Sequence, residues 1–129
     1  MKKITQIKTF ADACKVEGLN SKKVIPDFSS YPKQDQKAMI AHAKLVIIAR
    51  AANRLANDGK EWKPDWKNFN QDKYYPWFEM NGSSGFRFDV FVGWYSASTV
   101  GSRLCFISYD VARQIGKQFT SLYKAYFTI

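Results

Sequence analysis

The chain has 129 residues, 46% of them hydrophobic and 16% aromatic, which is enough for one domain spanning residues 1–129 with its own hydrophobic core. This content excludes an intrinsically disordered chain, and the large aromatic share indicates that some rings reach the surface. The formal net charge of +9 favours polyanionic partners and excludes a mimic of DNA, which would need the opposite sign.

The N-terminal segment has the positive charges of a signal peptide but no uninterrupted apolar run, because Lys8 and Asp12 interrupt it. No later stretch approaches the ~20 apolar residues that a membrane-spanning helix needs. We therefore expect a cytoplasmic protein with no membrane partner.

The first half of the chain predicts two helices. A short one runs from Thr9 to about Val16, with Thr9 as N-cap, Asp12 completing a capping box and Gly18 ending the helix. After an irregular connection, a long alanine-rich core helix runs from residues 32–33 to about 57 and ends at Asp58. Its apolar residues fall on one face: Ala38, Ala41, Leu45, Ile48, Ala49, Ala52, Leu55 and Ala56.

The other faces of the long helix are basic. Lys33, Lys37 and Lys44 form one stripe, and Arg50 and Arg54 form an adjacent pair four residues apart. Ile40 and Ile47 lie beside this strip, so either another element or a partner covers them.

An aromatic run, WKPDWKNFNQDKYYPWF, follows at residues 62–78. We expect residues 62–71 to form an irregular lid that its tryptophans hold against the core. A strand over residues 73–80 then has Pro76 at an edge or bulge and turns Tyr74 or Tyr75 outward.

The rest of the chain predicts more strands and a last helix. A turn at 81–85 leads into an extended segment at 86–95, whose alternate residues Phe86, Phe88, Val90, Val92 and Trp94 face the core. A third strand is expected at 103–108, and a helix from residues 109–110 to about Phe127, with Ser108 as N-cap. The predicted class is α+β, in which the long core helix and the C-terminal helix pack on a small antiparallel meander of two or three strands.

No motif indicates an enzyme. The candidate acids and bases do not form convincing pairs; they are Asp65, Asp72, Glu79, Asp89 and His42. The sequence has no phosphate-binding glycine-rich loop, no metal-ligand spacing and no nucleophile elbow. Cys14 and Cys105 lack ligand partners and are expected to be small buried hydrophobes. We expect no catalytic residue, no metal and no cofactor.

Nucleic-acid binding accounts best for the composition. Residues 1–60 hold 12 basic against 5 acidic side chains and residues 61–129 hold 8 against 6, so positive charge precedes the aromatic run. Basic grooves with stacking rings bind single strands, which we favour slightly over duplex. The candidate contact residues are Lys37, Lys44, Lys67, Lys73, Tyr74, Tyr75, Arg87, Tyr95 and Arg103. The alternative is a structural or protein-interaction module that forms a homo-oligomer or binds another protein.

Three strings, WKPDWKNFNQDKYYPWF, GSRLCF and GKQFTSLYKAYF, occur in this order over residues 62–127. In this half the chain resembles small uncharacterised proteins encoded by bacteriophages and prophages of gut bacteria. The resemblance implies a phage setting, in the cytoplasm of the host cell, and no particular activity. In that setting the alternative module would be a virion component or an inhibitor of a host protein.

Overall fold

The computed structural model describes residues 2–68, 70–82, 85–93 and 103–128. A short 3-10 helix and two α-helices precede a β-hairpin, and two further helices follow it. In chain order the elements are η1 (Lys2–Gln6), α1 (Phe10–Glu17), α2 (Lys33–Ala56), β1 (Tyr75–Gly82), β2 (Gly85–Gly93), α3 (Tyr109–Gln118) and α4 (Thr120–Phe127).

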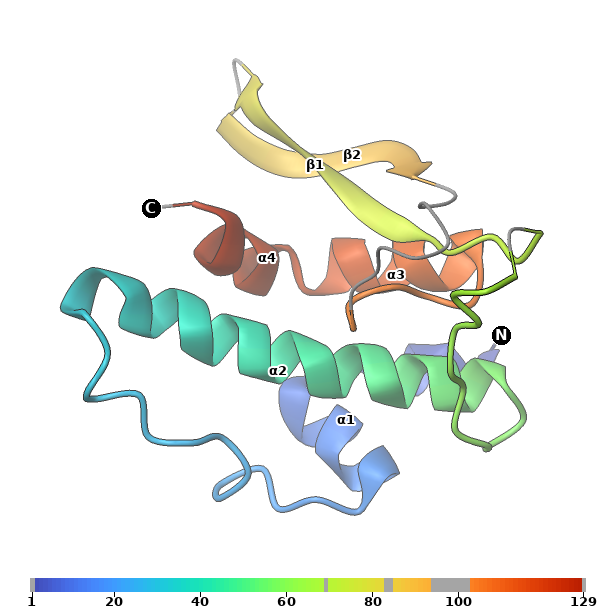
Figure 1. Cartoon of the computed structure of the whole chain (residues 1–129), viewed down its shortest axis with the longest axis horizontal. Helices are drawn as coiled ribbons and strands as arrows, with labels where there is room; N and C mark the ends of the chain where they lie inside the picture. The colour runs from blue at the N-terminus through green and yellow to red at the C-terminus, as the bar shows by residue number, and fades with distance from the viewer. Residues whose placement is uncertain (1, 69, 83–84, 94–102, 129) are drawn as a thin grey trace.

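The helix α2 lies in the middle of the molecule (Figure 1). One side of α2 is covered by α1, and the opposite side by α3 and α4, on which the hairpin of β1 and β2 is laid. The connection at residues 57–74 climbs along one end of this stack, from the end of α2 to the start of β1. None of the helices in the described part of the chain is long and apolar enough to cross a membrane.

The helix α1 begins and ends where its sequence predicts. The Thr9 hydroxyl accepts a hydrogen bond from the Asp12 amide at 3.2 Å, and the Asp12 carboxylate accepts one from the Thr9 amide at 3.0 Å. These bonds satisfy amides that have no partner within the helix. Gly18 ends α1 with a φ of 69°, in the left-handed region that glycine adopts without strain.

The prediction of a long core helix is confirmed by α2. Its buried face supplies alanines and larger aliphatic residues to one core, to which η1, α1, α3, α4, Leu104 and Phe106 also contribute. The alanines allow neighbouring elements to approach the α2 backbone closely, while the aliphatic side chains fill the space between them. The buried residues of α2 are Ala41, Leu45, Ile48, Ala49, Ala51, Ala52 and Asn53.

The predicted meander is present only as a two-stranded antiparallel hairpin, β1 with β2. Its register pairs Tyr75 with Gly93 and Phe78 with Phe88, with an irregularity between Pro76 and Phe78. The inward orientation predicted for Phe86, Phe88, Val90 and Val92 concerns side chains outside the description, and Trp94 lies outside the described residues.

The third strand predicted at 103–108 is wrong. Only one bridge joins this segment to the strand region: Tyr74 and Phe106 exchange backbone hydrogen bonds of 3.2 and 2.8 Å. The Asn53 side chain of α2 donates to the Cys105 carbonyl at 3.0 Å and accepts from the Ile107 amide at 2.9 Å, which holds the edge of this segment that faces away from Tyr74. On the edge that faces β1, the next hydrogen-bonded pair of an antiparallel ladder would join Leu104 to Pro76, and proline has no N–H to donate.

The single C-terminal helix predicted to Phe127 is also wrong, because it is divided at Phe119. The Ser108 cap is confirmed by a 3.3 Å hydrogen bond from the Val111 amide. At the division the Thr120 hydroxyl donates to the carbonyls of Gly116 and Lys117, at 2.9 and 3.1 Å, and so competes with the helical ladder. The change of direction brings Tyr123 of α4 under the hairpin, where its ring stacks on Phe78 at 4.8 Å.

Candidate functional site

A large concave surface lies at the C-terminal half of α2. It is a groove of about 760 Å³, open to solvent, between α2, the connection at residues 61–66 and the segment at 103–105. We call it the tryptophan groove; it is lined by Val46, Arg50, Asn53, Glu61, Trp62, Lys63, Pro64, Trp66, Arg103 and Cys105. This volume lies within the usual range of small-molecule sites, about 300–1,000 Å³.

Two half-buried tryptophans, Trp62 and Trp66, give the groove its aromatic surface. The ammonium group of Lys73 lies over the Trp66 ring, 5.2 Å from its centroid. The same ammonium donates hydrogen bonds to the carbonyls of Asp65, at 2.7 Å, and Asn68, at 3.1 Å. One lysine thus fixes both the turn at 65–68 and the ring that this turn carries.

Lys73 is not a surface residue, which corrects the prediction that it contacts a nucleic acid. It is 1% exposed, and its positive charge is directed at loop carbonyls and an aromatic face. Lysines are rarely buried unless their polar groups are satisfied, and here two carbonyls satisfy the ammonium. Lys73 supports the groove from behind.

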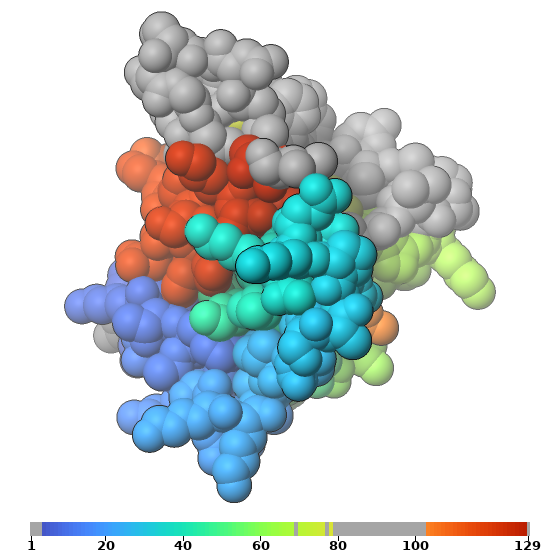
Figure 2. Space-filling view, turned by 90° about the vertical axis from the view of Figure 1, so that its left-hand side faces the viewer, coloured from blue at the N-terminus to red at the C-terminus, as the bar shows by residue number. Residues whose placement is uncertain are grey.

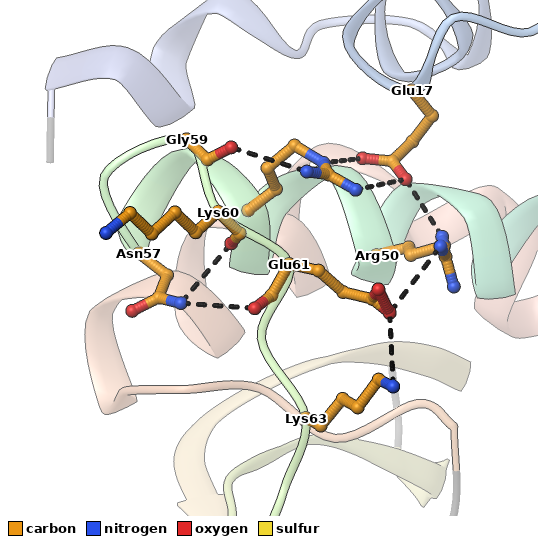
Figure 3. A network of polar contacts seen from close by, with 8 residues as sticks. Glu17, Arg50, Asn57, Gly59, Lys60, Glu61 and Lys63 are labelled. Atoms are coloured by element: carbon orange, nitrogen blue, oxygen red, sulfur yellow. Dashed lines mark hydrogen bonds and ion pairs between the residues drawn. The ribbon is translucent and has the colours of Figure 1, made fainter.

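The charged lining of the tryptophan groove is mainly basic. Arg50, Lys63 and Arg103 have exposed side chains there, against the single carboxylate of Glu61. As Figure 3 shows, the Glu61 carboxylate lies between Arg50 and Lys63, 3.7 Å and 4.0 Å from their nitrogens. With three cations and one anion the groove attracts negatively charged ligands.

The back of the groove offers no activated nucleophile. Burial raises the pKa of Cys105 to about 11, an effect that the nearby charge of Lys73 reduces only in part. The thiol therefore stays protonated at neutral pH, whereas the thiolate is the reactive form. Asn53 is fully engaged with the backbone of 105–107, so it holds the groove together rather than facing a ligand.

The acidic and imidazole candidates whose side chains are described have separate partners. The Asp65 carboxylate accepts a hydrogen bond from the Lys67 amide at 3.0 Å and closes a turn. The Asp72 carboxylate accepts one from the Tyr74 hydroxyl at 3.4 Å, and the His42 ring packs against Tyr126 with centroids 4.7 Å apart. The side chains of Glu79 and Asp89 are outside the description.

Of the predicted contact residues whose side chains are described, only Arg103 lines the tryptophan groove. Lys67 is exposed on the adjoining turn. Tyr74 and Tyr75 are both half-buried, and Tyr74 packs against the core cluster, so it is not the freely exposed stacking ring that the sequence predicts. Desolvation and the nearby Asp72 carboxylate raise the pKa of the Tyr74 hydroxyl.

The basic stripe of α2 lies elsewhere. Lys37 is exposed on the second turn of α2. Figure 2 shows this first part of α2, in cyan, facing the viewer between α4 and the connection at 19–32. The Lys44 ammonium lies over the Phe10 ring at 5.5 Å. Lys37 and Lys44 therefore do not join Arg103 in one site.

The two remaining predicted contacts have no described side chain. Arg87 lies on β2, where its backbone is paired with Glu79, and Tyr95 is outside the described residues.

The two isoleucines of the basic strip have different surroundings. Ile47 packs against the core cluster, whereas Ile40 is 37% exposed. Another element therefore covers Ile47, and a partner surface on this side of α2 would rest on Ile40.

Sequence reasoning missed most of the groove. The sequence indicates Arg50 only as one of a helical pair and places the two tryptophans in the lid, and nothing in it points to Glu61 or Asn53. The spacing of two tryptophans around Lys63 is the one signal in the sequence that points to this surface.

Within the described part of the chain, no three histidine, cysteine, aspartate or glutamate side chains gather as a metal site would require. Comparisons with protein-family models, with curated proteins and with solved structures found no match to this chain.

Proposed function

We propose that the chain is a non-catalytic nucleic-acid-binding protein, encoded by a phage as the resemblance of residues 62–127 implies, and that it holds single-stranded segments in the tryptophan groove. One observation carries the proposal: Trp62 and Trp66 share a single groove with the cations Arg50, Lys63 and Arg103. Rings on which bases stack, next to cations that neutralise phosphates, are what single-strand binding requires.

The size and the openness of the groove support a short stretch of an open chain. A cavity of about 760 Å³ holds one or two nucleotides, while the rest of the strand continues over the surrounding surface. A duplex keeps its bases stacked on one another, so it would leave the two tryptophans unused. The net charge of +9 adds long-range attraction for any polyphosphate.

The test is a fluorescence titration with an oligothymidylate of about eight nucleotides at low salt. We expect the strand to quench tryptophan fluorescence. Trp66→Ala should weaken binding by about 1–3 kcal/mol, the usual contribution of one stacked base. Tyr31→Ala, which removes a 43% exposed ring far from the groove, is the matched control and should bind like the parent chain.

A second pair of variants distinguishes binding in the tryptophan groove from general electrostatic attraction to the protein. Arg103→Ala should weaken binding and lower the slope of log affinity against log salt by about 0.7, the share of one phosphate contact. Arg113→Ala removes the same charge from an exposed position on α3 outside the groove and should change the slope little. If the oligonucleotide does not bind at low salt, or if the two arginine variants behave alike, the proposal fails.

A further inference from the structure

Arg50 contacts two carboxylates of different kinds. Its Nε lies 2.8 Å from Glu17 of α1, whose side chain is 3% exposed, and its Nη2 lies 3.7 Å from Glu61, whose side chain is 37% exposed. Figure 3 shows Glu17 and Glu61 on different sides of the guanidinium group. One contact is buried and short, and the other is open and long.

The contact with Glu17 is permanent. Glu17 also receives two hydrogen bonds from Arg54, at 2.6 and 3.4 Å, and Arg54 in turn donates to the Gly59 carbonyl at 3.3 Å. Without Arg50 the buried Glu17 Oε1 would keep only the long 3.4 Å bond from Arg54, and a poorly satisfied buried carboxylate costs free energy. Glu17 therefore holds Arg50 by its Nε, while the Nη2 of Arg50 faces Glu61 and the tryptophan groove.

The contact with Glu61 is exchangeable. Exposed ion pairs at such distances contribute little to stability, since water and salt screen them. The second cation that Glu61 approaches, Lys63 at 4.0 Å, is 82% exposed. The Glu61 carbonyl accepts a 3.4 Å hydrogen bond from the Asn57 side-chain Nδ2, so the Glu61 carboxylate can leave without any change in the path of the chain.

We infer that Arg50 and Lys63 form a phosphate subsite that the Glu61 carboxylate occupies until a ligand phosphate displaces it. The inference rests on the proposed function for the identity of the ligand, and it adds a competitor built into the site. Guanidinium groups bind carboxylate and phosphate with the same geometry, but a phosphate diester within a strand also brings a base to Trp62 or Trp66.

The competitor makes the groove selective. A free carboxylate or a chloride ion gains no more from Arg50 than Glu61 already provides, and the chain keeps Glu61 beside Arg50, so these ions replace it only at high concentration. A phosphate that carries a base also gains stacking on a tryptophan, and it therefore displaces Glu61. Removal of the Glu61 charge should therefore raise the affinity for phosphates in general, including phosphates without a base.

The experiment compares Glu61→Gln with Asp58→Asn. Both substitutions remove one negative charge from the same connection, but Asp58 is exposed and does not line the tryptophan groove. Its φ of 56° is one that asparagine adopts readily, so the control should fold normally. Binding is measured with the oligothymidylate by fluorescence and with inorganic pyrophosphate by the NMR shift of the Arg50 Nε–H group.

We expect Glu61→Gln to bind both probes about fivefold more tightly than Asp58→Asn, as the loss of one competing ion pair predicts. Equal affinities of the two variants for pyrophosphate would overturn the inference. A parent chain that binds no oligothymidylate at low salt would refute the proposed function alone, because the pyrophosphate comparison still decides whether Glu61 guards an anion subsite.

Discussion

At the residue scale, Tyr123 is the side chain whose surroundings fit it least well. It is 2% exposed, its ring stacks on Phe78, and its hydroxyl has no hydrogen-bond partner among the described groups. Burial raises the pKa of this hydroxyl above its ordinary value of 10.0. The ring stabilises the contact between α4 and the hairpin, while the oxygen atom costs free energy because it is buried without a partner.

Tyr123→Phe should therefore increase the free energy of unfolding by about 1 kcal/mol at neutral pH, as measured by urea denaturation. The gain should grow as pH rises above 10.0, because the unfolded parent chain ionises there while the folded one keeps its proton, which lowers the stability of the parent alone. Tyr126→Phe, at a half-buried ring of the same helix, is the control. A loss of stability in Tyr123→Phe would mean that the hydroxyl has a partner after all.

At the element scale, the connection between α2 and β1 is organised by Lys73. This lysine joins two carbonyls of the turn at 65–68 and the face of Trp66, so a segment without helix or strand has a fixed shape. The tryptophan groove depends on that shape, because Trp66 is one of its walls.

Lys73→Met keeps most of the apolar stem and removes the ammonium group. We expect it to lower the free energy of unfolding by about 2 kcal/mol, the range for hydrogen bonds to a charged group, and to make Trp66 more accessible to acrylamide quenching. Lys67→Met removes an equal charge from an exposed position on the same connection and should leave both measurements unchanged. Equal quenching in the two variants would show that Lys73 does not position Trp66.

The helices could be predicted where the signal was local. The capping box of Thr9 and Asp12 and the apolar face of α2 are written in neighbouring residues, and both predictions are confirmed. The division at Phe119 could not be predicted, because the apolar spacing continues through it while a threonine hydroxyl competes for carbonyls. The third predicted strand failed because Pro76 has no N–H where the ladder with this segment would continue, while Asn53, which lies 52 residues away from Cys105 in the sequence, holds the other edge of the segment.

The site was predictable only in part, because contacts between residues far apart in the sequence leave no local signal. Arg103 and the aromatic run were identified from composition, but nothing local indicates that Arg103 meets Arg50 of α2 across the groove. Lys73 and Lys67 are equivalent lysines by sequence, and only the tertiary structure makes one buried and the other exposed.

At the scale of the whole molecule, the stack of α1, α2, the α3 and α4 pair and the hairpin leaves one end to the connection at 57–74 (Figure 1). The tryptophan groove opens beside this connection. Residues of α2, of the chain before the hairpin and of the chain after it line this single surface. The protein-interaction alternative, which rests on Ile40, predicts instead a stable oligomer or a protein complex that is indifferent to oligonucleotides. Mass measurement in solution distinguishes the two.

The central claim is that a single strand lies in the tryptophan groove, and photo-cross-linking tests it most directly. An oligothymidylate that contains 4-thiothymidine is irradiated with the protein at low salt, and the cross-linked peptides are identified by mass spectrometry after trypsin digestion. Because Pro64 follows Lys63, trypsin leaves residues 61–67 as one peptide that contains both tryptophans. We expect cross-links to peptide 61–67 that Arg103→Ala reduces; cross-links confined to other peptides would show that the strand lies elsewhere.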